Sequence, residues 1–309
     1  MKVAHLIIAY KDPLQVERLA RLISSHEDFD CWIHIDKKTD IRLFENLKQI
    51  PRLRFIQNRI RVNWAGFSCV QAAMNGLDEI IKSGDQYDFV NLMSGQDYPI
   101  KPMNFIHDFF SENIGKSFIA SEAEPSAWWD HAILRFSKYH FTDFRFKGKT
   151  RLQQFLNKFM PDRRFLESYT LYGGPFSSYW TLSMEAAVYV RNFLKINKKI
   201  RKFCKYTWAP DEFLISTILM NSHLRNSIIN NPCRHIDWSS GGAHPGILKL
   251  KDFTVLKSSP YLFARKLDRQ IDERILDRID TELLDLKTEK KNQMLFFASF
   301  QKYRKDSAS

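Results

Sequence analysis

The sequence lacks the short motifs that mark several large enzyme classes. The 309 residues contain no G-x-x-x-x-G-K-[ST] phosphate loop and no G-x-G-x-x-G dinucleotide-binding turn. A G-x-S-x-G nucleophile elbow and an H-E-x-x-H zinc motif are absent as well. The nine histidines show no metal-binding spacing. Any phosphate that binds to this chain must therefore be held by other means, such as cationic side chains.

Cysteine and long apolar runs are also scarce. The four cysteines (Cys31, Cys69, Cys204 and Cys233) form no C-x-x-C pair, which argues against a zinc ribbon or a thioredoxin-type motif. We expect buried free thiols in a reducing compartment. The apolar run at residues 6–9 is too short for a signal peptide, and no run approaches the roughly 20 residues of a membrane span. These features predict a cytoplasmic protein.

The composition is that of a folded chain, with 44% hydrophobic residues and only 11 glycines and 11 prolines. Strands are expected at 3–9, 31–36, 53–57 and 89–93, with helices at 14–24 and 67–83 between them. This alternation predicts a mostly parallel sheet flanked by helices. Ligands bind at the carboxyl ends of the strands in such sheets, where Asp36 and Asp97 fall. Farther along, we expect a strand at 252–256 and a helix at 267–286.

Positive charge is concentrated in three blocks. The net charge is +12, but residues 145–164, 191–205 and 287–305 carry +6, +7 and +5, so the remainder is net −6. Such blocks favour an anionic partner, such as a glycolipid head group, a membrane surface, a nucleotide or a nucleic acid; a solvated basic face is the simpler alternative. Residues 294–300 are rich in aromatics and lie between lysines, which is typical of an interfacial helix or of a helix docked on the core.

Two short segments carry candidate chemistry. Pro210-Asp211-Glu212 places two carboxylates in the first turn of a helix, where one could act as a general base or both could simply stabilise the helix dipole. Arg265-Lys266, expected at the start of a helix, could hold a diphosphate and stabilise its departure. The single D-x-D match, Asp28-Phe29-Asp30, precedes a strand, and we interpret it as a surface turn.

Eight motifs in order resemble the core-2/I-branching family of β-1,6-N-acetylglucosaminyltransferases and peptide O-xylosyltransferases. The resemblance extends from about residue 2 to about residue 285. The motifs are Ala9-Tyr10-Lys11-Asp12, Ile33-His34-Ile35-Asp36-Lys37, Val62-Asn63-Trp64-Ala65-Gly66, Ser94-Gly95-Gln96-Asp97-Tyr98-Pro99, Ser178-Tyr179-Trp180, Pro210-Asp211-Glu212, His235-Ile236-Asp237-Trp238 and Phe263-Ala264-Arg265-Lys266.

The resemblance implies an α/β, GT-A-like, Rossmann-type nucleotide-sugar transferase fold. It also implies inverting transfer from a UDP-sugar without a metal or other cofactor. Residues 1–286 would then form one glycosyltransferase domain, with a nucleotide-binding half at 1–115 and an acceptor and catalytic half at 116–286. Residues 287–309 would form a basic aromatic tail.

By position in the family's motifs, Glu212 matches the catalytic base, Arg265 and Lys266 match the cations that bind the diphosphate, and Asp36 matches the acid near the uridine. Trp64 and Asp97 are assigned to the donor side on the same grounds.

The acceptor is assigned to four other residues. Glu122 and Arg135 fall near the family's acceptor-binding Glu and Arg, and Trp180 and Asp211 are placed on the same side.

Some features depart from the family pattern. Trp64-Ala65-Gly66 replaces the usual Trp-Gly-Gly, and Ser178-Tyr179-Trp180 lacks the acid of the xylosyltransferases. The chain has neither the membrane anchor nor the cysteine pattern of the family's animal Golgi members, so it resembles a bacterial-type member. We therefore expect N-acetylglucosamine first and xylose second as the transferred sugar, and an acceptor glycan, free or lipid-linked, of a bacterial surface polysaccharide.

We expect peripheral contact with the inner membrane through the basic blocks and the tail. The alternatives are a nucleic-acid-binding protein that uses the basic blocks and an inactive sugar-binding scaffold. The absence of RRM, KH and helix-turn-helix signatures argues against nucleic acid as a partner.

Overall fold

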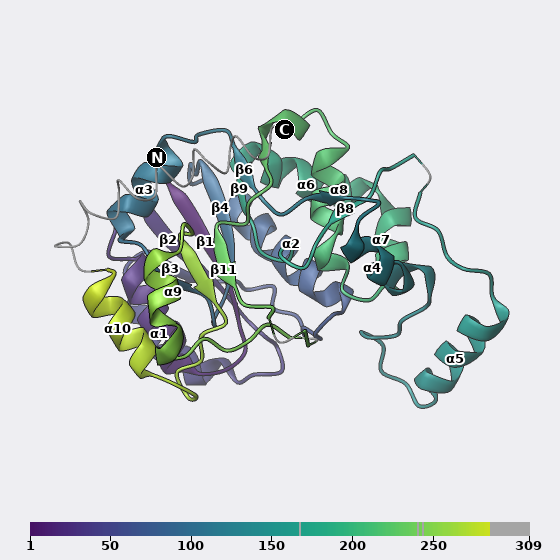
Figure 1. Ribbon diagram of the computed structural model, residues 1–309, viewed down its shortest axis with the longest axis horizontal. Helices are drawn as coiled ribbons and strands as arrows, with labels where there is room; N and C mark the ends of the chain where they lie inside the picture. The colour runs from purple at the N-terminus through teal and green to yellow at the C-terminus, as the bar shows by residue number, and fades with distance from the viewer. Residues whose placement is uncertain (167, 240, 243, 285–309) are drawn as a thin grey trace.

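The computed structural model describes residues 1–284 except 167, 240 and 243. A seven-stranded sheet forms its centre, in the order β10-β6-β9-β4-β1-β2-β3 (Figure 1). Strand β9 is antiparallel to β4 and β6, and the other neighbouring strands are parallel. The predicted mostly parallel sheet is therefore confirmed. Its strands are β1 (Val3–Ala9), β2 (Phe29–Ile35), β3 (Leu53–Phe55), β4 (Phe89–Ser94), β6 (Ser117–Phe118), β9 (Thr181–Ser183) and β10 (Ile228–Ile229).

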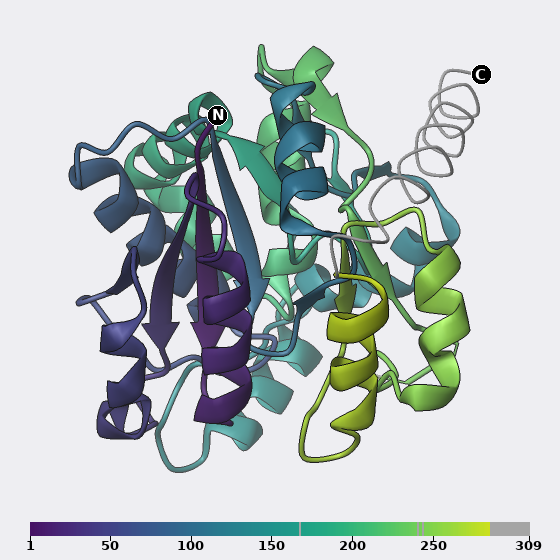
Figure 2. The same ribbon diagram turned by 90° about the vertical axis from the view of Figure 1, so that its left-hand side faces the viewer.

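Helices cover both faces of this sheet, which explains why β2 is buried throughout and β1 is buried at every position but Ile8. Alternate residues of β1 enter two separate hydrophobic clusters: Val3 and Ile7 enter one, and Ala4 and Leu6 the other. The first cluster lies under α1 (Pro13–Ile23), η1 (Ile41–Gln49), α3 (Met103–Ser111), α9 (Phe253–Ser258) and α10 (Arg274–Glu282); Figure 2 shows α1 and α10 on this face. The second lies under α2 (Phe67–Lys82), α4 (Ala127–Ser137), α6 (Met184–Ile196), α7 (Lys198–Cys204) and α8 (Leu214–Met220).

Two small sheets and several short elements complete the fold. One sheet has the order β11-β12-β5, and the other pairs β7 with β8. The remaining elements are β5 (Tyr98–Pro99), β7 (Glu122–Ala123), α5 (Lys149–Phe159), β8 (Tyr172–Gly173), η2 (Pro210–Glu212), η3 (Arg225–Ser227), β11 (Arg234–Ile236), η4 (Leu250–Asp252) and β12 (Phe263–Arg265). The main sheet takes strands from both expected halves of the domain.

Two predictions about the last third of the chain are wrong. The expected strand at 252–256 is helical, because Phe253 and Leu256 are buried three residues apart while Val255 between them is exposed. The expected helix at 267–286 begins only at Arg274. Asp268 instead accepts hydrogen bonds from Lys11 and Gln96 in a loop. Arg265 therefore ends strand β12, and Lys266 follows it, instead of both starting a helix.

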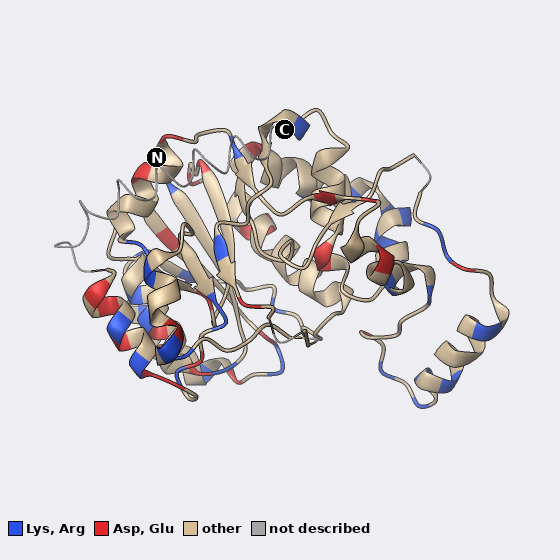
Figure 3. Ribbon diagram, viewed as in Figure 1, with Lys and Arg blue, Asp and Glu red and all other residues tan. Residues whose placement is uncertain are grey.

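The basic blocks have different surroundings. The block at 145–164 includes α5, which stands apart from the rest of the protein (Figures 1 and 3). The predicted tail at 287–309, with its aromatic run at 294–300, lies outside the described residues. Within the described part of the chain, no helix has both the length and the apolar character needed to cross a membrane.

Candidate active site

A cavity of about 830 Å³ opens at the carboxyl ends of the central strands. Tyr10, Asp36 and Gln96, which follow β1, β2 and β4, line one side of it. Residues from α4, η2 and β12 line the other sides. The volume lies within the range of small-molecule sites, roughly 300–1,000 Å³. The location is the one that open α/β sheets use for ligands.

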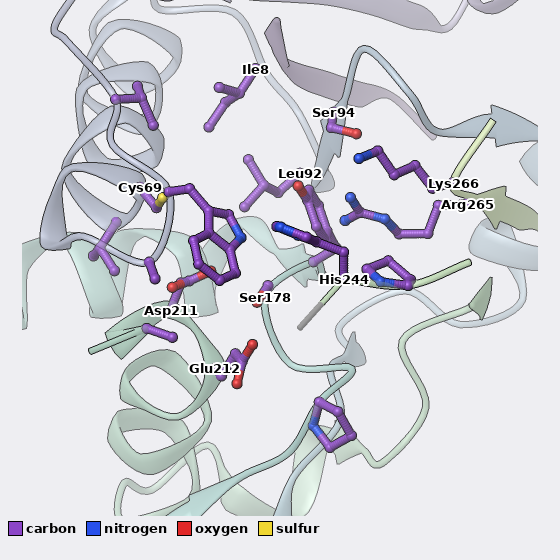
Figure 4. Close-up of a pocket in the computed structure, with 18 of the residues that line it drawn as sticks. Ile8, Cys69, Leu92, Ser94, Ser178, Asp211, Glu212, His244, Arg265 and Lys266 are labelled. Carbon is purple, nitrogen blue, oxygen red and sulfur yellow. The ribbon is translucent and has the colours of Figure 1, made fainter. Parts of the chain in front are cut away.

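The cavity brings together most of the residues singled out from the sequence. Eight of them line it: Asp36, Trp64, Arg135, Trp180, Asp211, Glu212, Arg265 and Lys266. The other two, Asp97 and Glu122, are not among the lining residues. Figure 4 shows Arg265 and Lys266 entering from one side, and Asp211 and Glu212 lying on another.

Glu212 is a carboxylate with the proton affinity of a general base at neutral pH. It ends the short helix η2 and forms an ion pair with Arg135 of α4. Burial raises the pKa of Glu212 to about 7, and the neighbouring Asp211 adds to the rise while Arg135 opposes it. Arg135 binds Oε2 of Glu212, whereas Oε1 receives no hydrogen bond from the described residues and is available to a ligand hydroxyl. Such a base works best when its pKa lies near the working pH.

Asp211 lies beside this base in a different environment. Burial raises the pKa of its carboxyl group, and a hydrogen bond from Ser178 partly offsets that effect. Its buried Oδ1 has no hydrogen-bond partner among the described residues. An unpartnered buried acceptor that lines a cavity can receive a hydroxyl hydrogen bond from a ligand.

Arg265 is held in place by groups that are themselves fixed. Its guanidinium lies 3.8 Å from the ring centroid of Tyr179, and its Nε lies 3.4 Å from Oδ1 of Asp97. A cation stacked on an aromatic ring and paired with a buried carboxylate keeps one orientation. The forked end of the side chain is directed into the cavity (Figure 4).

Lys266 supplies a second positive charge next to the first. Burial lowers the pKa of its ammonium group, and the nearby charges of Arg265 and Lys11 lower it further. Two positive charges that are close together and partly desolvated are stabilised most by a ligand with two or more negative charges. A diphosphate has that character.

Asp36 lines the cavity directly after β2. Its Oδ1 accepts a hydrogen bond of 2.8 Å from the Lys38 backbone, and its Oδ2 lies 3.3 Å from the Lys38 ammonium. Arg59 donates to the carbonyl oxygens of residues 35, 36 and 39 and so fixes this turn.

An aromatic group borders the cavity. The Trp64 side chain is 52% exposed, and its ring lies 5.1 Å from that of Trp208 and 4.5 Å from that of His244. Partly exposed aromatic faces beside carboxylates are suited to packing against a sugar ring or a base. Trp180, in contrast, is almost fully buried and forms part of the cavity wall.

The two residues outside the lining have other contacts. Asp97 is fully buried; it accepts hydrogen bonds from the backbone and hydroxyl of Ser94, and it faces both Arg265 and Arg234. Its side chain can therefore act on a donor only through Arg265. Glu122 is exposed on strand β7, outside the cavity.

The comparisons with known proteins identify the family of the chain. The family described as "Branch: Core-2/I-Branching enzyme" matches residues 3–257. The chain belongs to this family. The match confirms the resemblance drawn from the motifs.

The curated relatives are longer proteins. A xylosyltransferase of Ciona intestinalis is 22% identical over 306 residues, which cover 92% of this chain and 34% of the relative. Xylosyltransferase 2 of Homo sapiens is 24% identical over 310 residues, with the same coverage. The chain thus spans about a third of these relatives. Among solved structures, mouse xyloside xylosyltransferase 1 in its apo form is 11% identical, with a TM-score of 0.37 over 78% of this chain and 90% of that one.

The structure explains how this family member departs from the Trp-Gly-Gly pattern. Ala65 has a φ of 58°, in the left-handed region that glycine adopts without strain. Gly66 remains glycine because a Cβ there would lie 2.3 Å from Oδ1 of Asp143. Asp143 also accepts hydrogen bonds from Asn63 and from the backbone and hydroxyl of Ser68, so it has little freedom to move.

The D-x-D pair lies at the opposite end of β2 from Asp36. Asp30 is buried and binds Tyr87 and Lys2, while Asp28 pairs with His107. With His26, these two last residues form the one group of three potential metal ligands in the described part of the chain. This group lies away from the cavity, so the D-x-D pair is not placed to hold a donor diphosphate.

His244, Cys69 and Tyr179 are among the residues of the site that sequence reasoning missed. His244 comes from a loop without any recognisable pattern, and Cys69 lines the wall from α2. Tyr179 belongs to a family motif, but nothing in the motif reveals that its ring supports Arg265. The only indication of Tyr179 in the sequence was its place between Ser178 and Trp180 in that motif.

Proposed function

We propose that this protein transfers a sugar from a UDP-sugar to a hydroxyl group of a glycan acceptor, with inversion at the anomeric carbon. The observation that carries the proposal is the placement of Glu212 and the cation pair Arg265–Lys266 on different sides of one cavity (Figure 4). A base on the acceptor side and fixed positive charge on the leaving-group side are the two requirements of a direct displacement.

The reaction would proceed in one step. The acceptor oxygen forms a bond to the anomeric carbon while the bond from that carbon to the phosphate oxygen of UDP breaks. Glu212 takes the hydroxyl proton, and the electron pair of the broken bond leaves with UDP. Arg265 and Lys266 stabilise the negative charge that develops on the diphosphate. Base assistance of this kind contributes about 10²–10⁴-fold to a rate.

Several finer features belong to the same proposal. Asp36 contacts the uridine, and the two cations do the work that a divalent metal does in other transferases, so no metal is required. The sequence alone favoured N-acetylglucosamine over xylose as the donor sugar. The curated relatives are named xylosyltransferases, which supports testing UDP-xylose on equal terms.

The acceptor is proposed to be a bacterial surface glycan on a lipid carrier at the inner membrane. Asp211 and Arg135 are its proposed contacts, with Trp180 in the wall behind them. Glu122, assigned to the acceptor from the sequence, could reach only a part of the glycan that extends beyond the cavity.

Glu212→Gln tests the base directly. We expect UDP release from the preferred donor to fall at least 100-fold, while the rise in melting temperature with UDP is kept. Glu185→Gln, an exposed glutamate at the start of α6, is the matched control and keeps full activity. Loss of the UDP-induced shift in Glu212→Gln would contradict its assignment as a base.

A ligand screen by thermal shift tests the donor site. UDP, UDP-N-acetylglucosamine, UDP-xylose, UDP-glucose and UDP-galactose are each added with EDTA or with Mn²⁺. We expect a UDP-dependent shift that survives EDTA and is largest with the true donor. A shift that requires Mn²⁺ would refute the role given to Arg265 and Lys266, and the absence of any shift would refute the donor site.

A further inference from the structure

Helix α5 is attached to the protein by its polar face. Gln153 accepts a hydrogen bond of 2.8 Å from the Phe141 backbone. Asn157 accepts one of 2.7 Å from the Tyr139 backbone and donates one of 2.9 Å to the Tyr139 carbonyl. Gln153 and Asn157 are four residues apart and so share one side of the helix. That side faces the chain segment that leads into α5.

The apolar face of α5 points the other way. Leu152, Phe155 and Phe159 are 42%, 57% and 63% exposed, and the two phenylalanine rings pack on each other at 4.9 Å. At about 100° per residue, Phe155 and Phe159 lie roughly opposite Gln153 and Asn157, and Leu152 borders the same outward face. A surface helix normally has the reverse arrangement, with its apolar stripe on the core. An apolar face turned outward in this way indicates a partner.

The charges around this face identify the kind of partner. Residues 145–164 contain seven basic residues and one acidic residue, Asp162, which pairs with Lys138. Positive residues are visible along α5 and its flanks in Figure 3. The cations that are exposed are Arg145, Lys147, Arg151, Lys158 and Arg164. A second copy of this chain would present the same positive charge, whereas an anionic lipid surface offers both negative head groups and an apolar layer.

We propose that α5 is an interfacial helix that lies on a bilayer containing anionic lipid. Leu152, Phe155 and Phe159 enter the boundary of the acyl chains, and the exposed cations contact the head groups. The segment before α5 contains Asp143, which binds Ser68 and Asn63 next to Trp64 at the cavity. This segment therefore joins α5 to residues beside the cavity. Binding of α5 to a membrane does not depend on the proposed sugar transfer.

Vesicle co-sedimentation of the full chain tests this proposal. The probes are vesicles of phosphatidylcholine alone and of phosphatidylcholine with 30% phosphatidylglycerol. We expect binding only to the anionic vesicles. Leu152→Ser/Phe155→Ser/Phe159→Ser should reduce the partition coefficient at least tenfold, as should Arg151→Glu/Lys158→Glu. The matched control is Leu43→Ser/Val255→Ser, which alters side chains that are 62% and 53% exposed elsewhere and leaves binding unchanged.

Folding and self-association are checked on the same variants. The melting temperature and the UDP-induced shift should be unchanged, because these side chains lie outside the core and the cavity. Three results would each overturn the proposal. They are failure of the unaltered chain to bind anionic vesicles, equal binding by the triple serine variant, and a lipid-free dimer that the triple variant converts to a monomer. The last result would identify a second copy as the occupant.

Discussion

The pH dependence of the reaction should report the environment of Glu212. The base must be ionised to accept a proton, and its pKa is raised to about 7. We therefore expect kcat/KM to fall tenfold per pH unit below about pH 7 and to level off above it. Arg135 opposes this rise because its positive charge favours the ionised carboxylate. Removing that charge in Arg135→Met should move the acidic limb of the profile of kcat/KM against pH to higher pH.

The size of the movement follows from the geometry. Two unit charges about 4 Å apart interact by roughly 4 kcal/mol at an effective dielectric constant of 20. The Arg135 side chain is 34% exposed, so solvent screening reduces this to about 1–2 kcal/mol. That corresponds to a movement of about one pH unit, since one unit equals about 1.4 kcal/mol.

UDP release measured from pH 5 to pH 9 decides the question. The position of the limb is the readout, because Arg135 is also a proposed acceptor contact and its loss can lower the plateau. Lys138→Met is the matched control: Lys138 follows α4 closely and pairs with exposed Asp162, so its removal leaves the limb in place. A limb that stays at the same pH in Arg135→Met, or moves to lower pH, would refute the reasoning.

Three further predictions concern binding and stability. Lys266→Ala should weaken UDP binding about tenfold or more by isothermal titration calorimetry and leave uridine binding unchanged, because only the diphosphate contact is lost. Glu212→Gln should raise the melting temperature at pH 8 but not at pH 4. Because the pKa of Glu212 is raised in the folded state, ionisation of this carboxyl group destabilises the folded state by about 1–3 kcal/mol as the pH rises from about 4.5 to 7, and glutamine does not ionise. Gly66→Ala should cost about 1–3 kcal/mol in urea unfolding because the new Cβ collides with Asp143, and that cost should disappear in an Asp143→Ala background. Additivity of the last two substitutions would show that the collision is not the cause.

The sequence predicted those cavity residues that lie in family motifs or directly after a strand. Family motifs singled out Glu212, Arg265 and Lys266, which line the cavity, and the strand pattern placed Asp36 at the edge of the sheet where the cavity opens. The same rule suggested that Asp97 lines the cavity. Strand order fixes the edge of a sheet but not the direction of a side chain in the turn that follows. Asp97 turns back to Ser94 and to two arginines that arrive from distant strands.

Helix α5 shows a related limit. The expectations from the sequence included no helix at 149–159, although the spacing of Leu152, Phe155 and Phe159 fits one face of a helix. That spacing cannot show which face meets the rest of the protein. That depends on Gln153 and Asn157, whose side-chain amides bind the backbone of a segment more than ten residues earlier. Hydrogen bonds between an amide and a backbone group leave no periodic pattern that could be found in advance.

The proposed base and the aromatic border of the cavity are held by one set of backbone contacts. Trp208 N donates to the Arg135 carbonyl, Ala209 N donates to the Ala65 carbonyl at 2.8 Å, and Glu212 N donates to the Ala209 carbonyl. Ala65 and Ala209 both have left-handed backbone angles, with φ of 58° and 48°. A non-glycine residue adopts this region at a cost of about 1–2 kcal/mol. Two such residues joined by a hydrogen bond persist only because the surrounding packing fixes both loops. A sugar that packs against Trp64 therefore meets a surface whose position is tied to that of Glu212, so binding at the border and alignment of the base are coupled.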